Sequence, residues 1–75
     1  MKYVMVVDND GQDAPILFPE TITHSSAVNN LRSVVVSAGF CYKKDGNWVA
    51  EGMSESLRKK SRPEDTALIQ RHFKS

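Results

Sequence analysis

The sequence predicts a small α+β domain, in which an antiparallel β-sheet built of two hairpins is combined with a short central helix and a C-terminal helix. Segments rich in β-branched and aromatic residues flank turn formers at two places, after Val7 and around Asp45-Gly46. A third pattern, the SRPE that begins at Ser61, is typical of a helix start. With 75 residues, we expect residues 1–75 to form one domain with a thin core, since such a chain buries only about 60% of its unfolded surface.

The first hairpin is predicted between Val7 and Ala14. Its first strand, Lys2 to Val7, reads KYVMVV, and the six residues that follow, DNDGQD, all favour turns. The return strand extends from Ala14 to Phe18 and ends before Pro19, whose missing N–H excludes it from a central ladder.

A short helix is predicted between Thr21 and Leu31, where apolar residues have helical spacing. Its N-cap candidates are Thr23, Ser25 and Ser26. The segment that follows is ambiguous between a strand and a helix that continues to a C-capping Gly39. We favour a strand from Ser33, because three successive valines lose side-chain freedom in a helix.

The second hairpin is predicted from Phe40 to Ala50, and its register is open. A two-residue turn at Asp45-Gly46 sets Lys43 opposite Trp48. A three-residue loop with Gly46 at positive φ sets Tyr42 opposite Trp48 instead. We favour the second register, because it gathers the aromatic side chains on one face.

The last elements are a strand from Ser54 to Leu57 and a helix from about Ser61 to Phe73. Ser61 and Glu64 match a capping box, and Pro63 stands in the first turn, where its missing N–H costs nothing. The apolar residues Leu68, Ile69 and Phe73 give this helix one side for the core.

Several chemistries find no support in the residues. The single cysteine, Cys41, cannot form an intrachain disulfide, and the N-terminal apolar run is too short for a signal or a membrane span, so we expect a cytoplasmic protein without membrane contact. The acidic turn after Val7 does not match a calcium loop, and His24, Cys41 and His72 lack zinc spacing. We expect no metal, no cofactor and no enzymatic activity, with Cys41 packed as a small hydrophobe.

The main candidate binding site is the basic segment that adjoins the C-terminal helix. Cations beside a helix N-terminus suit a phosphate or a carboxylate, although the same pattern is typical of a solvated turn. The candidate residues for an anion or a partner are Arg58, Lys59, Lys60, Ser61, Arg62, Ser54 and Ser56. A secondary candidate surface, on which bases stack, is Tyr42, Lys43, Lys44 and Trp48, but a small domain needs most of its aromatic residues for its core.

Charge is distributed unevenly along the chain. Residues 1–20 carry one lysine against four carboxylates, a net charge of −3, whereas residues 58–75 carry six cations against two carboxylates, a net charge of +4. This asymmetry and the thin core favour a homo-oligomer, most simply a dimer. Duplex DNA is not an expected partner, because the overall charge is only +1.

The succession of short motifs MKYV, FP, THS, SAGF, SESL and SRPEDTALI resembles uncharacterised small accessory proteins of tailed phages and prophages. This resemblance covers nearly the whole chain and brings no catalytic residues. It implies a protein that acts in a host cell by stoichiometric association with a host factor, as an inhibitor of a host or defence protein. The alternatives are a protein that sequesters a nucleotide-like anion and a nucleic-acid-binding accessory protein.

Overall fold

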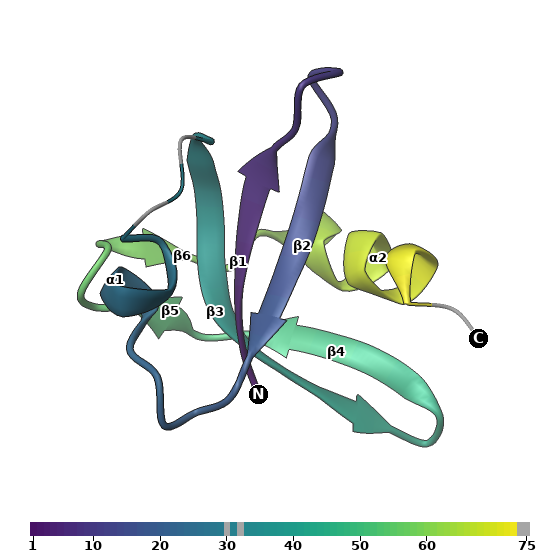
Figure 1. The fold of residues 1–75 in the computed structure, drawn as a ribbon. Helices are drawn as coiled ribbons and strands as arrows, with labels where there is room; N and C mark the ends of the chain where they lie inside the picture. The colour runs from purple at the N-terminus through teal and green to yellow at the C-terminus, as the bar shows by residue number, and fades with distance from the viewer. Residues whose placement is uncertain (30, 32, 74–75) are drawn as a thin grey trace.

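The computed structural model describes residues 1–29, 31 and 33–73 and has the predicted α+β class. Four antiparallel strands form a sheet in the order β2-β1-β3-β4, and a two-stranded ribbon, β5-β6, stands beside it (Figure 1). The strands are β1 (Lys2–Val7), β2 (Asp13–Phe18), β3 (Val35–Lys44), β4 (Asn47–Glu51), β5 (Met53–Ser54) and β6 (Lys59–Lys60). The helices are α1 (His24–Ala27) and α2 (Pro63–His72).

The β1-β2 hairpin confirms the first prediction, with Lys2 opposite Phe18. The Asp8 carboxylate holds the turn, since it accepts the N–H groups of Asp10 at 2.9 Å and Gln12 at 3.0 Å. All of β1 from Tyr3 to Val6 is buried, as expected for a strand with a layer on each side.

The central helix is shorter than predicted. Thr23 caps α1 as expected and accepts the Ser26 N–H at 3.1 Å, but the helix ends at Ala27. Part of the predicted range, residue 30, lies outside the described residues. The valine-rich segment is a strand, which confirms the favoured alternative, although β3 begins at Val35.

The favoured register of the second hairpin is wrong. Lys43 pairs with Trp48, and the turn has two residues, Asp45 at φ 53° and Gly46 at φ 83°. Two successive positive φ angles define a primed turn, whose twist matches that of the strands, and Asp accepts this conformation more readily than most residues. The aromatic side chains are consequently divided between the two faces of the hairpin.

The segment after β4 is also corrected. The predicted strand from Ser54 to Leu57 is only the end of β5, because the chain turns at once and returns as β6. The Ser54 hydroxyl accepts the Leu57 N–H at 3.2 Å inside this turn, and Arg58 ends it with φ at 54°. The serine therefore stabilises a turn in place of a strand.

Helix α2 is present, but its cap differs from the prediction. The Ser61 N–H donates to the Gly52 carbonyl at 2.9 Å, so Ser61 remains bound to the ribbon. Arg62 is the N-cap residue, and the Asp65 carboxylate accepts its N–H at 3.0 Å. The capping pair is thus shifted by one residue from Ser61 and Glu64.

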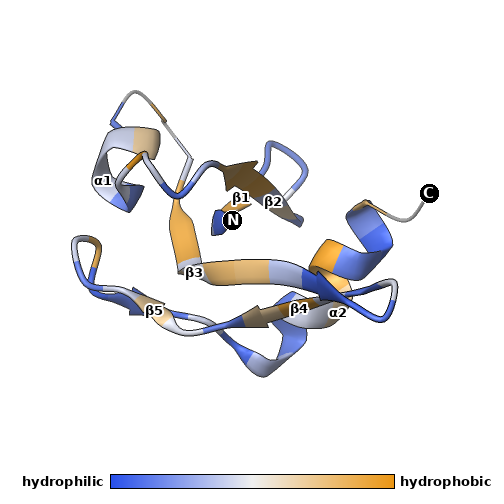
Figure 2. Ribbon diagram, turned by 90° about the horizontal axis from the view of Figure 1, so that it is seen from below, coloured by the Kyte–Doolittle hydropathy of each residue, from blue (hydrophilic) through white to orange (hydrophobic). Residues whose placement is uncertain are grey.

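Two small cores lie on opposite faces of the sheet, with α1 and α2 on different sides (Figure 2). The core beneath α2 contains Tyr3, Met5, Cys41 and Ile69. The core beneath α1 contains Val4, Val6, Phe18 and Ala38. Alternation along β1 supplies both, because successive side chains of a strand point to opposite faces.

Both outer edges of the sheet are protected against further strands. On β4, the Trp48 N–H donates to Gln70 Oε1 at 2.6 Å and the Ala50 N–H donates to Thr66 Oγ1 at 3.0 Å, so side chains of α2 occupy the edge. On β2, Pro15 stands in the strand and has no N–H to offer. Pairing through an exposed sheet edge is therefore disfavoured.

Candidate functional site

The basic segment divides into an exposed part and a part committed to the fold. Arg58, Lys59 and Lys60 are exposed on the β5-β6 ribbon, and none of them forms an ion pair with another described residue. Their charges are available to a partner. Ser61 is half-buried between the ribbon and α2.

Arg62 belongs to an internal ion-pair network. Its Nη2 lies 2.9 Å from Asp13 Oδ2 and 2.9 Å from Asp65 Oδ1, and Nη1 lies 3.9 Å from Glu64. Burial lowers the pKa of Arg62, but the hydrogen bonds to Asp13 and Asp65 outweigh it, and the pKa is raised overall. The residue expected to grip an anion thus already holds the acidic first hairpin against α2.

The network ends at a fully buried carboxylate. Asp65 accepts a hydrogen bond from the Tyr3 hydroxyl at 2.6 Å as well as from Arg62. Burial raises the pKa of Asp65, but hydrogen bonds from Tyr3 and Arg62 favour the ionised form, and the pKa falls below its usual value. Burial and the Asp65 carboxylate together raise the pKa of Tyr3 strongly, so the phenol stays protonated.

The remaining serines of the predicted site face a different hollow. Ser54 is buried and its hydroxyl lies 3.3 Å from that of Ser56. Both border a cleft of about 450 Å³ between the start of α1, β3 and the ribbon, which we name the α1 cleft. Its other principal lining residues are Lys2, Thr23, His24, Phe40, Met53 and Glu55.

A buried histidine braces the α1 cleft. The His24 ring stands edge-on between Phe18 and Phe40, with ring centroids 5.3 Å and 5.7 Å away. Its Nε2 lies 2.9 Å from the Gly39 carbonyl oxygen, which only accepts, so this nitrogen donates. The ring is fixed by contacts from two strands, the end of β2 and the middle of β3.

The secondary candidate surface is divided by the observed register. Trp48 is half-buried on the α2 side, with Lys43 Nζ 5.6 Å from its ring centroid and Phe73 6.1 Å away. Tyr42 is on the other face, so the two rings do not form one stacking surface.

We name the side of the β3-β4 hairpin opposite α2 the open face. Its side chains are Phe40, Tyr42 and Lys44 from β3 and Asn47, Val49 and Glu51 from β4. Phe40 is 38% exposed and Tyr42 is 42% exposed. The Tyr42 hydroxyl donates to Glu51 Oε1 at 2.9 Å, a hydrogen bond that raises the pKa of Tyr42.

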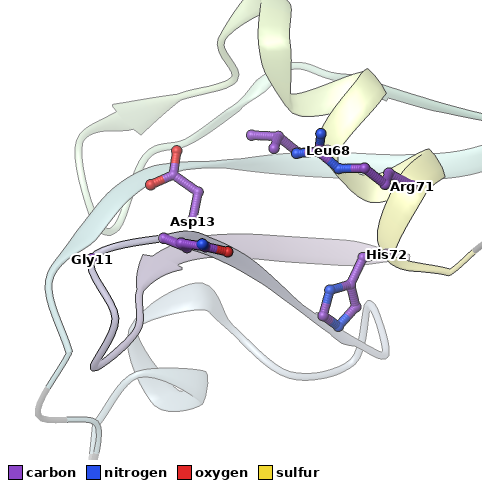
Figure 3. Close-up of a pocket in the computed structure, with 6 residues that line it drawn as sticks. Gly11, Asp13, Leu68, Arg71 and His72 are labelled. Atoms are coloured by element: carbon purple, nitrogen blue, oxygen red, sulfur yellow. The ribbon is translucent and has the colours of Figure 1, made fainter.

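A second, more polar cleft of about 760 Å³ lies between the first hairpin turn and the end of α2 (Figure 3). Its lining residues are Gly11, Gln12, Asp13, Leu68, Arg71 and His72. The sequence offered no signal for it, because the two segments meet only through the packing of α2 on the sheet.

Cys41 is buried in the core beneath α2, and burial raises the pKa of its thiol. Among the described residues, no group of three or more histidine, cysteine, aspartate or glutamate side chains is arranged to hold a metal ion. The described part of the chain also contains no helix long and apolar enough to cross a membrane.

No family model, curated protein or solved structure matches this chain. The resemblance to phage accessory proteins therefore stays a prediction.

Proposed function

We propose that this protein is a small non-catalytic binding protein that associates stoichiometrically with a partner protein through the open face. The observation that supports the proposal is the placement of Phe40 and Tyr42, which are more than a third exposed on a face that α2 does not cover. The chain has only six aromatic residues, and a thin core gains most from burying them. Adjacent exposed aromatics are typical of binding surfaces.

Tyr42 has the properties of a binding anchor. Its hydroxyl is held by Glu51 across the strand pair, so little side-chain freedom remains to be lost on binding. Phe40 is braced by His24 on one side, and its ring lies close to the glycine at position 52. Preorganised aromatic anchors of this kind carry much of the affinity at protein interfaces.

Two lysines are on or beside the surface that carries these rings. Lys44 is on the open face itself, and Lys60 is paired with the exposed Met53 on the neighbouring ribbon. Neither lysine forms an ion pair within the described part of the chain. A partner with an apolar centre and acidic residues at its rim would complement this surface.

The resemblance to phage and prophage proteins supports a host factor as the partner, with inhibition of a host or defence protein in the host cytoplasm as the outcome. The protected sheet edges favour docking by a face over strand addition.

The test is quantitative capture from a host lysate with wild-type protein, Tyr42→Ala and Val34→Ala. Val34 is a matched control, because it is 67% exposed but precedes β3 at the far end of the strand. A partner that uses the open face is retained by wild type and Val34→Ala and bound about 30-fold more weakly by Tyr42→Ala, as expected for an anchor worth about 2 kcal/mol. Equal affinity of all three proteins for every captured partner contradicts the proposal.

A further inference from the structure

The α1 cleft has an apolar wall with a fixed ring. Phe40 contributes this ring and Met53, 49% exposed, adds a flexible thioether side chain. The Phe40 ring stands perpendicular to that of His24, with an interplanar angle of 87°, and a Cβ added at Gly52 would be 3.1 Å from Phe40 Cδ1. A partly exposed ring held on two sides is suited to stacking against a planar ligand ring.

One cation, Lys2, lines the same cleft, and a second, Lys60, is paired with the lining residue Met53. Lys2 Nζ donates to the Ile22 carbonyl at 3.1 Å and forms no ion pair among the described residues. Lys60 is directly opposite Met53 in the ribbon, and opposite residues of an antiparallel pair share a face. The Ser56 hydroxyl borders the cleft as well, so charge and a donor are available to a phosphate group.

The cleft also contains a carboxylate, that of Glu55, which forms no ion pair with another described residue. Glu55 is exposed and lines the cleft with Lys2, yet the two make no ion pair. Their charges are therefore separated, and a ligand complementary to both needs an anionic group at one place and an N–H donor at another. A volume of about 450 Å³ is within the range of small-molecule sites.

We propose that the α1 cleft binds a nucleoside monophosphate whose base carries an amino group. The base stacks on Phe40 beside Met53, the phosphate lies at Lys2 and Lys60, and the amino group donates to Glu55. This cleft is lined by Ser54 and Ser56 of the predicted anion site but not by Arg62, whose charge is neutralised inside the fold. The cleft shares Phe40 and Met53 with the proposed protein-binding surface, but Tyr42 and Lys44 do not line it, so variants at Tyr42 and Lys44 distinguish the two proposals.

The test is a titration of the ¹⁵N-labelled protein with adenosine monophosphate, followed by NMR and calorimetry. Inosine monophosphate, adenosine and inorganic phosphate are the comparison ligands, since each lacks the amino group, the phosphate or the base. We expect shifts confined to residues of the α1 cleft, with adenosine monophosphate bound at least fivefold more tightly than each comparison ligand.

Variants separate the three contacts. Phe40→Leu and Lys2→Gln should each raise Kd at least tenfold, and Glu55→Ala should abolish the preference for adenosine over inosine monophosphate. The matched controls Tyr42→Leu and Lys44→Gln, outside the cleft, should leave Kd within twofold. If Phe40→Leu does not fold, Lys2→Gln alone decides. An unchanged Kd in Lys2→Gln, shifts centred on Arg71 and His72, or no shifts at 5 mM nucleotide would each overturn the proposal.

Discussion

Replacing Asp65 with asparagine should remove a large part of the stability of this fold. The carboxylate is completely buried and receives the Tyr3 hydroxyl at 2.6 Å, the Arg62 N–H at 3.0 Å and the Arg62 Nε at 3.0 Å. Asparagine has nearly the same shape, but it leaves the half-buried Arg62 guanidinium without the buried carboxylate that neutralises it. Breaking a buried ion pair in this way costs about 3 kcal/mol. A 75-residue domain has roughly 4–11 kcal/mol in total, so Asp65→Asn should lose between about a quarter and three quarters of its stability.

The assay is urea denaturation followed by circular dichroism, with Glu64→Gln as the matched control. Glu64 carries the same charge one residue earlier but is exposed and 3.9 Å from Arg62, so its loss should change the free energy of unfolding by less than about 0.5 kcal/mol.

The pH dependence of stability provides a second readout. Because the pKa of Asp65 is lowered in the folded state, its contribution is complete above the unfolded pKa of about 3.9 and is lost as the pH falls through the folded pKa. Asp65→Asn should therefore lose less stability than wild type between about pH 5 and pH 2. An Asp65→Asn protein within about 0.5 kcal/mol of wild type would refute this account of the network.

Three further predictions concern the backbone, the sheet edge and self-association. Gly39→Ala should destabilise the fold by about 3 kcal/mol in the same denaturation assay, because the new Cβ would be 2.5 Å from the Glu51 carbonyl oxygen, whereas Gly11→Ala, with open space around it, should cost only about 1 kcal/mol. Gln70→Ala should cost about 1 kcal/mol and increase aggregation on heating, measured by turbidity, because it frees the Trp48 N–H at the edge of β4, while Gln12→Ala on the first turn should leave aggregation unchanged. The protein alone should form a weak dimer by light scattering at high micromolar concentration, and Tyr42→Glu should make it monomeric. Because Asp13 and Arg62 already pair within one chain, the dimer should depend little on ion pairs between chains. Raising the salt from about 0.05 M to 0.5 M should therefore change its dissociation constant only weakly.

Local patterns predicted those parts of the fold that local physics determines. The β1-β2 hairpin follows from strand formers on either side of a turn, and the valine-rich strand from the preferences of β-branched residues. The register favoured at Asp45-Gly46 is wrong, because the fold does not place the aromatic side chains on a single face. In the structure α2 supplies a second layer for Trp48, so the aromatics need not share a face.

The site depends on contacts that spacing does not reveal. Asp65 looks like a partner for the helix dipole, and only the position of Tyr3 in the central strand shows that it is an interior carboxylate. One signal was present in the sequence, since a tyrosine in a fully buried strand requires a partner for its hydroxyl. The α1 cleft had no comparable signal, because His24, Phe40 and Met53 come together only when the sheet forms.

The most direct test of the proposed function is cross-saturation NMR on the labelled chain bound to its captured partner. Irradiating the partner should attenuate the resonances of Phe40, Tyr42 and Met53 most strongly, since these exposed side chains are on or beside the open face. Signals from the outer side of α2 and from the turn at residues 8–11 should stay unchanged. Attenuation centred on either of those two regions, with the open face unaffected, would contradict the account.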